Sequence, residues 1–158
     1  MVLHVVAVGR VRDAAFRAAC DEYVARIRRT QRLELKEVRE AGRRARNAST
    51  ALRLEGDALL EAIPEGSRPF ALTRGGRGYT SEQFARQLSA WQHDARDVAL
   101  IIGGAHGLDQ RVLDRAEGTL SLSQLTMPHE LARVVLTEQL YRALTILRGE
   151  PYHKGSHE

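Results

Sequence analysis

The chain has 158 residues, of which 43% are hydrophobic and 28% charged, and this composition favours one globular domain spanning residues 1–158. No apolar run approaches the length of about 18 residues that a membrane-spanning helix needs, and residues 1–8 resemble a strand rather than a signal peptide. The single cysteine, Cys20, excludes an intrachain disulfide and a multi-cysteine metal site. We therefore expect a cytoplasmic protein with no membrane association.

The net charge of +4 is unevenly spread along the chain. Residues 1–53 contain 13 Lys and Arg against 6 Asp and Glu, whereas residues 54–158 contain 11 against 14. A basic first third predicts a surface that binds phosphate groups, and a merely solvated surface is the alternative.

Strands and helices are predicted to alternate along the whole chain. Asp13 is a typical helix cap, and Thr80 with Gln83 matches a capping box. The stretches 39–46, which is basic, and 74–78, which is rich in glycine, are expected to be loops. Strands are expected at residues 2–9, 33–38, 68–73, 97–102 and 119–122, and helices at 14–29, 47–62, 80–95, 109–116 and 128–148. This alternation predicts an α/β fold whose mainly parallel sheet is flanked by helices.

The last predicted helix, residues 128–148, has more apolar side chains than one buried stripe can hold. A helix that is apolar on several sides must be covered on several sides. The sheet supplies one cover, and we expect a second copy of the chain to supply the other. A deeply buried helix in a monomer is the alternative.

Two predicted strands near each other in the sequence are followed by segments suited to a ligand. The first ends at Gly103 and Gly104, and the second leads into Ser123, Thr126 and the residues around them. Glycines leave the backbone open at the carboxyl edge of a sheet, where α/β proteins bind ligands. We expect one pocket here, which a side chain at position 104 would block. A plain strand-to-helix turn is the alternative for the glycines.

Polar side chains at the two ends of the last helix are candidates for work on a substrate. His129 and Arg133 are four residues apart and share a face beside the expected pocket. Tyr152, His153 and Lys154 follow the helix and offer a stacking ring, an imidazole and an amine. A capping histidine and a frayed chain end are the ordinary alternatives.

Taken together, these segments resemble the RlmH family of SPOUT-class methyltransferases, which methylate N3 of a pseudouridine in 23S ribosomal RNA. The resemblance extends over nearly the whole chain. It rests on residues 3–9, Tyr23, residues 102–108, residues 121–129, Arg133, residues 138–143 and residues 151–154.

The resemblance implies a SPOUT domain with a C-terminal trefoil knot, a homodimer, S-adenosylmethionine as methyl donor and the ribosome as partner. It implies that the donor is bound by Leu72, Thr73, Gly103, Gly104, Ser123, Gln124, Leu125, Thr126, Met127 and Pro128. Catalytic roles are implied for His129, Arg133 and His153. Tyr152, His153 and Lys154 are implied to bind the substrate, and the basic composition adds Arg43, Arg44 and Arg46.

The chain departs from the family pattern after Leu72, because it has Thr73 and Arg74 where the third strand of relatives ends in Leu-Asp or Leu-Glu. Two other classes of protein are alternatives to a methyltransferase. A non-enzymatic ribosome-associated protein would explain the basic first third but not the glycine edges. A flavodoxin-type or Rossmann-type oxidoreductase would need a phosphate-binding loop after the first strand, where Gly9 is the single glycine.

Overall fold

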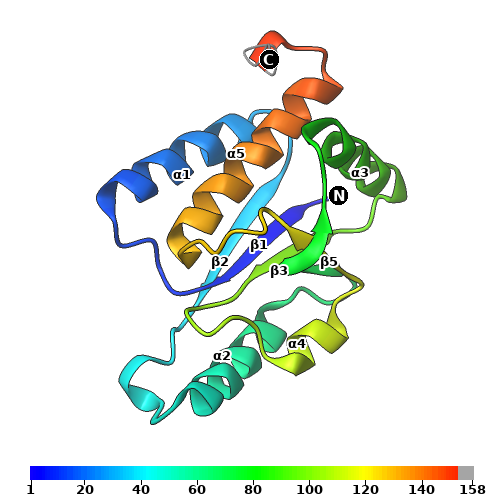
Figure 1. The fold of residues 1–158 in the computed structure, drawn as a ribbon. Helices are drawn as coiled ribbons and strands as arrows, with labels where there is room; N and C mark the ends of the chain where they lie inside the picture. Colours follow the sequence, from blue (N-terminus) through cyan, green and yellow to red (C-terminus); the bar gives the residue numbers. More distant parts are fainter. Residues whose placement is uncertain (153–158) are drawn as a thin grey trace.

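In the computed structural model, which describes residues 1–152, five parallel strands form one sheet in the order β2-β1-β4-β3-β5 (Figure 1). The strands are β1 (Leu3–Val8), β2 (Leu33–Val38), β3 (Arg68–Gly78), β4 (Val98–Ile102) and β5 (Gly118–Ser121). The helices are α1 (Ala14–Arg28), the short 3-10 helix η1 (Gly42–Arg44), α2 (Ala48–Ala62), α3 (Ser81–Asp94), α4 (Gln110–Arg115) and α5 (His129–Leu147). The α/β fold predicted from the alternation of elements is confirmed.

The centre of the sheet is apolar because strands β1 and β4 are covered on both faces. Every residue of these two strands is buried, and they pair in parallel with Leu3 opposite Val98. Strands buried on both faces are expected to be continuous apolar runs rather than alternating ones. β2, at one edge, instead buries only its first residue, Leu33.

Helices cover the sheet in two layers (Figure 1). Helices α1, α3 and α5 lie on one face and α2 and α4 on the other. The larger core lies under α1, α3 and α5 and includes the fully buried Trp91, whose ring centroid is 4.8 Å from that of Phe70. A smaller core, with Leu59 and Val112, lies under α2 and α4.

The predicted start signals of the helices are present. Asp13 accepts hydrogen bonds from the backbone N–H groups of Ala15 and Phe16. Thr80 and Gln83 form both bonds of the capping box at the start of α3. Pro128 differs slightly from the expectation, because it is the cap residue that precedes α5 rather than the first helical residue.

Both stretches predicted as loops contain regular structure. Residues 74–78 continue β3, because they pair with β5 after an irregularity that places both Leu72 and Arg77 opposite Leu120. A Cβ at Gly76 would lie 2.7 Å from the backbone of Leu120, so this close approach requires glycine. In residues 39–46, η1 forms, and Ala41 is buried with its N–H donated to Glu55.

Within residues 1–152, helix α5 is fully buried on one side and half-buried on the rest of its surface. Leu136, Leu140 and Leu144 are buried against the sheet and its neighbours. Leu131, Val134 and Val135 remain half-buried. The trefoil knot stays a prediction from the resemblance.

Candidate functional site at the carboxyl edge of the sheet

A cavity of about 400 Å³ opens where strands β4 and β5 end and α5 begins, beside the middle of β3. This is the edge at which α/β sheets bind ligands, and the volume lies in the range of small-molecule sites. Eight of the ten residues predicted to bind a methyl donor line it: Leu72, Thr73, Gly103, Gly104, Ser123, Leu125, Thr126 and Met127. Gln124 instead faces a neighbouring hollow beside residues 74–78, and Pro128 is exposed before α5.

The two glycines after β4 are needed for packing within the protein. A Cβ at Gly103 would collide with the backbone of Gly107, where the loop folds back on itself. A Cβ at Gly104 would lie 2.6 Å from Oε2 of Glu55 and 3.0 Å from Val8. The expectation that a side chain at position 104 would block the pocket is therefore wrong. That side chain would be driven into Glu55 on α2.

Glu55 is a buried carboxylate that sequence reasoning missed. It is 4% exposed, and its Oε1 accepts the N–H of Ala41 at 2.9 Å. Its Oε2 has no hydrogen-bond partner among residues 1–152 and faces Gly104. Nothing in the helical pattern of residues 47–62 distinguishes Glu55 from a solvated glutamate, because its neighbours come from distant segments.

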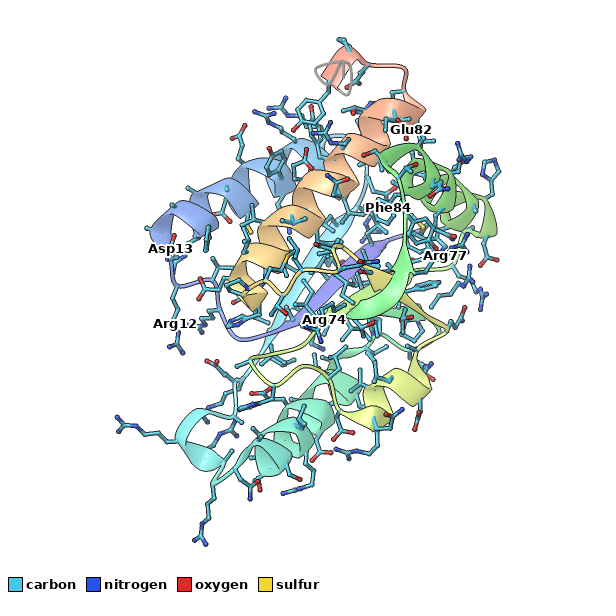
Figure 2. The ribbon with its side chains drawn as sticks, in the orientation of Figure 1. Arg12, Asp13, Arg74, Arg77, Glu82 and Phe84 are labelled. Carbon is cyan, nitrogen blue, oxygen red and sulfur yellow. The ribbon has the colours of Figure 1, made fainter. Side chains whose placement is uncertain are left out.

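The loop between β5 and α5 is held in place by a chain of hydrogen bonds. Ser121 donates to the carbonyl of Arg74 at 3.0 Å, and the hydroxyl of Ser123 accepts the N–H of Leu125. Nη1 of Arg74 donates to the hydroxyl of Thr126 at 2.9 Å. Figure 2 shows Arg74 beside this loop. The departure from the family pattern at position 74 thus places a guanidinium at the rim of the cavity.

His129 lines the cavity from the first turn of α5 and also approaches the end of β1. Its Nε2 lies 3.5 Å from the position that a Cβ on Gly9 would occupy. The imidazole therefore lies between the cavity and the loop that follows β1.

Arg133 is on the same face of α5 as His129, as predicted, but it does not line the cavity. It is 3% exposed. Its Nη1 is paired with the carboxylate of Glu37, and its Nη2 donates to the carbonyl of Gly9 at 2.9 Å. These bonds tie α5 to the ends of β1 and β2. This geometry suits a role for Arg133 in positioning His129 better than a role in direct contact with a substrate.

Tyr152 packs back against the middle of α5. Its hydroxyl donates to Glu138 at 3.1 Å and lies 3.3 Å from the hydroxyl of Tyr23. Its ring packs edge-on against Tyr141 at 4.8 Å, and the guanidinium of Arg142 lies over it. Burial, with the nearby Tyr23 and Glu138, raises the pKa of Tyr152 above its ordinary value.

Glu138 and Arg142, which are four residues apart on α5, form an ion pair of 2.6 Å beside this ring. His153 and Lys154 lie outside the described residues. Tyr152 folds back along α5 to Glu138, which lies nine residues after His129, or about 14 Å along the helix axis at 1.5 Å per residue.

Arg43, Arg44 and Arg46 are exposed on η1 and the turn after it. Arg44 donates to the carbonyl of Glu40, and none of the three has an acidic partner within the described part of the chain. They follow the carboxyl end of β2, so they lie toward the same edge of the sheet as the cavity.

Two further findings bear on ligands. Within residues 1–152 no group of three His, Cys, Asp or Glu side chains is arranged to hold a metal ion. In the same residues no helix is both long enough and apolar enough to cross a membrane.

Comparisons with known proteins agree with this geometry. A protein named ribosomal RNA large subunit methyltransferase H from an Anaeromyxobacter species is 51% identical over 154 residues, which is 98% of this chain and all of that protein. Proteins of the same name from Gloeobacter violaceus and Burkholderia thailandensis are 45% and 44% identical over 98% of this chain and the whole of each relative.

The fold is also similar to that of a solved structure, a probable methylase family protein from Haemophilus influenzae. The TM-score is 0.59 at 12% identity, over 99% of this chain and 72% of the other. A family model described as a predicted SPOUT methyltransferase matches residues 1–153. With the cavity at the sheet edge and relatives of full length, the chain belongs to the SPOUT methyltransferase family.

Proposed function

We propose that this protein transfers a methyl group from S-adenosylmethionine to N3 of a pseudouridine in 23S ribosomal RNA, on the assembled ribosome in the cytoplasm. The observation that carries the proposal is the cavity at the carboxyl edge, which gathers eight of the ten expected donor-binding residues. Full-length relatives named ribosomal RNA large subunit methyltransferase H support the substrate class. Neither a non-enzymatic RNA-binding protein nor an oxidoreductase accounts for both the cavity and the names of these relatives.

The cavity fits the proposed donor chemically. Leu72, Ile102 and Leu108 offer apolar surface for an adenine ring, and the open backbone at residues 103–107 offers polar groups to its edge. Arg74 at the rim offers a cation to a carboxylate. When bound, S-adenosylmethionine supplies a methyl group on a positively charged sulfur, which needs no further activation.

The acceptor nitrogen is a poor nucleophile until its imide proton leaves, so the protein must align the acceptor and take up a proton. His129 is the first candidate for taking up the proton, and its support is that it lines the cavity and that its Nε2 approaches Gly9. His153 remains the other candidate base. Arg133 holds α5, and with it His129, against β1 and β2.

We further propose that the active form is a homodimer in which the tail of one chain serves the cavity of the other. The half-buried face of α5 continues into an apolar hollow of about 230 Å³ beside Val135, Phe84 and Leu120. If two copies of α5 pack antiparallel about a two-fold axis, the end of one helix lies beside the start of the other. The tail that begins at Tyr152 would then lie beside the start of the partner's α5, where His129 is.

The test is methyl transfer from radiolabelled S-adenosylmethionine to ribosomes purified from cells that lack this enzyme. We expect one methyl group per ribosome, which mass spectrometry of nuclease fragments places on a pseudouridine of 23S ribosomal RNA. Free ribosomal RNA and separated subunits serve as controls for the substrate. Transfer to another nucleotide or to protein, or no transfer to any of these substrates, would contradict the proposal.

A further inference from the structure

A second hollow, of about 710 Å³, lies beside the cavity and is lined by four arginines. We call it the arginine cleft. One wall is the loop after β1, with Gly9, Arg10 and Arg12, and the other is the segment after β2, with Arg39 and Glu40. The carboxyl ends of neighbouring parallel strands therefore form its floor. Figure 2 shows Arg12 on the loop that follows β1.

The charges of the cleft do not cancel. Its two carboxylates are already paired, since Glu37 binds Arg133 and Glu40 lies 3.2 Å from Arg12. The guanidinium of Arg17 donates to the carbonyl of Val11, which is uncharged, so the positive charge of Arg17 is not compensated.

Arg10 and Arg39 are exposed, and neither has an ionic or hydrogen-bonding side-chain partner within the described residues. Three guanidinium groups, those of Arg10, Arg17 and Arg39, therefore remain without a compensating carboxylate. The cleft has a net positive charge and suits an anionic ligand.

His129 connects the cleft to the cavity. Its ring lines the cavity and approaches Gly9, and Gly9 lines the cleft. A Cβ on Gly9 would also lie 3.8 Å from Oε2 of Glu40, so this carboxylate of the cleft is close to Gly9 as well. A ligand in the cleft would thus lie on the opposite side of His129 from a ligand in the cavity.

We infer that the arginine cleft binds the phosphodiester backbone of the RNA next to the nucleotide that accepts the methyl group. This inference rests on the proposed function, because it takes RNA as the substrate. A polyanion suits the cleft better than a small anion, because the hollow is open and far larger than one phosphate. The exposed arginines of η1, Arg43 and Arg46, extend the same basic surface past the cleft.

The test compares two double variants with equal loss of charge. Arg10→Gln with Arg39→Gln neutralises the cleft. Arg29→Gln with Arg86→Gln neutralises two exposed arginines, one just after α1 and one on α3, that have no acidic partner within residues 1–152. Binding of ribosomes, and of a labelled single-stranded RNA, is measured at several salt concentrations. S-adenosylmethionine affinity is measured by calorimetry as a check on the cavity.

We expect the cleft variant to bind ribosomes about tenfold more weakly or worse, with a log–log salt slope reduced by about 0.7 to 0.9 for each lost phosphate contact. Its S-adenosylmethionine affinity should match that of the parent protein, and the control pair should keep the parent's slope. Equal weakening by both pairs, or no weakening by the cleft pair, would overturn the inference.

A third variant should change RNA affinity in the opposite direction. Glu40→Gln removes a negative charge from the wall of the cleft while retaining an oxygen for Arg12. It should tighten RNA binding, and weaker binding would count against a phosphate site.

Failure of the inference is distinguishable from failure of the proposed function. If the parent methylates its nucleotide and the cleft variant does so with unchanged kcat and KM, the cleft is not the phosphate site but the function stands. If the parent binds ribosomes through the cleft but transfers no methyl group, the function fails and the cleft remains an RNA site.

Discussion

Arg133 on α5 donates from Nη2 to the carbonyl of Gly9 at the end of β1, over 2.9 Å. The same guanidinium is paired with Glu37 at the end of β2, so a single buried side chain joins a helix to two strands. This arrangement fixes the start of α5, where His129 lies, relative to the sheet.

Replacing Arg133 should therefore reduce stability as well as activity. Arg133→Met removes the hydrogen bonds and leaves Glu37 without its partner, which should lower the free energy of unfolding by about 1–3 kcal/mol. Arg133→Lys keeps the charge but not the planar fork of the guanidinium, so its free energy of unfolding should lie between those of the parent and Arg133→Met. Urea denaturation measures the change. An Arg133→Met protein as stable as the parent but inactive would instead assign Arg133 a direct role in the reaction.

Gly104→Ala should destabilise the protein through Glu55. The new Cβ would meet Oε2 of Glu55 at 2.6 Å, and overpacking of this kind costs about 1–3 kcal/mol. The second-site change Glu55→Asp withdraws the carboxylate and should restore part of the loss. Gly75→Ala is the matched control, because nothing lies within 4 Å of a Cβ at that position. Thermal unfolding tests all three, and equal stability of Gly104→Ala and Gly75→Ala would refute the packing role.

The dimer predicts a position-specific effect of charge on α5. Val135 is half-buried at the apolar hollow, so Val135→Glu should dissociate the dimer while the chain remains folded. Leu144 is a poor test because it is 4% exposed within one chain, and a charge there would unfold the core. Ala90→Glu on the exposed side of α3 is the control and should leave the dimer intact. Sedimentation that shows a monomer for the parent protein would rule out the dimer.

The tail should be required for methyl transfer but not for binding the donor. Deleting residues 152–158 should abolish transfer, and deleting residues 155–158 should have little effect, because the family pattern ends at Lys154. Activity should reappear when the tail-deleted chain is mixed with an Ala132→Phe chain, whose own cavity is filled. Full turnover by the tail-deleted protein alone would return Tyr152 to the purely structural role that its contacts with Glu138 and Tyr141 describe.

Local sequence signals predicted the order of elements because each signal acts within a few residues. Asp13 and the Thr80 capping box fix helix starts through contacts with their own first turns. The apolar run of β4 needs no partner to be recognised. The cavity was predictable for the same reason, since its glycine and serine segments each follow a recognisable strand and parallel strands end at one edge.

Features that depend on distant segments were not predictable. Residues 74–78 become strand only because β5, more than 40 residues later, pairs with them. Glu55 is buried because Ala41 and Gly104 contact it from other segments. The arginine cleft forms because the sheet brings two loops together. No periodicity within a single element records such contacts.

The most direct test of the account is calorimetric titration of S-adenosylmethionine into the parent protein and two variants of Ala132, which lines the cavity from α5. The parent should bind the donor. Ala132→Ser should keep the parent's affinity, whereas Ala132→Phe should weaken it by about tenfold or more, equivalent to about 1.4 kcal/mol, without loss of thermal stability. Unchanged affinity in Ala132→Phe, or no binding by the parent, would contradict the assignment of this cavity to the methyl donor.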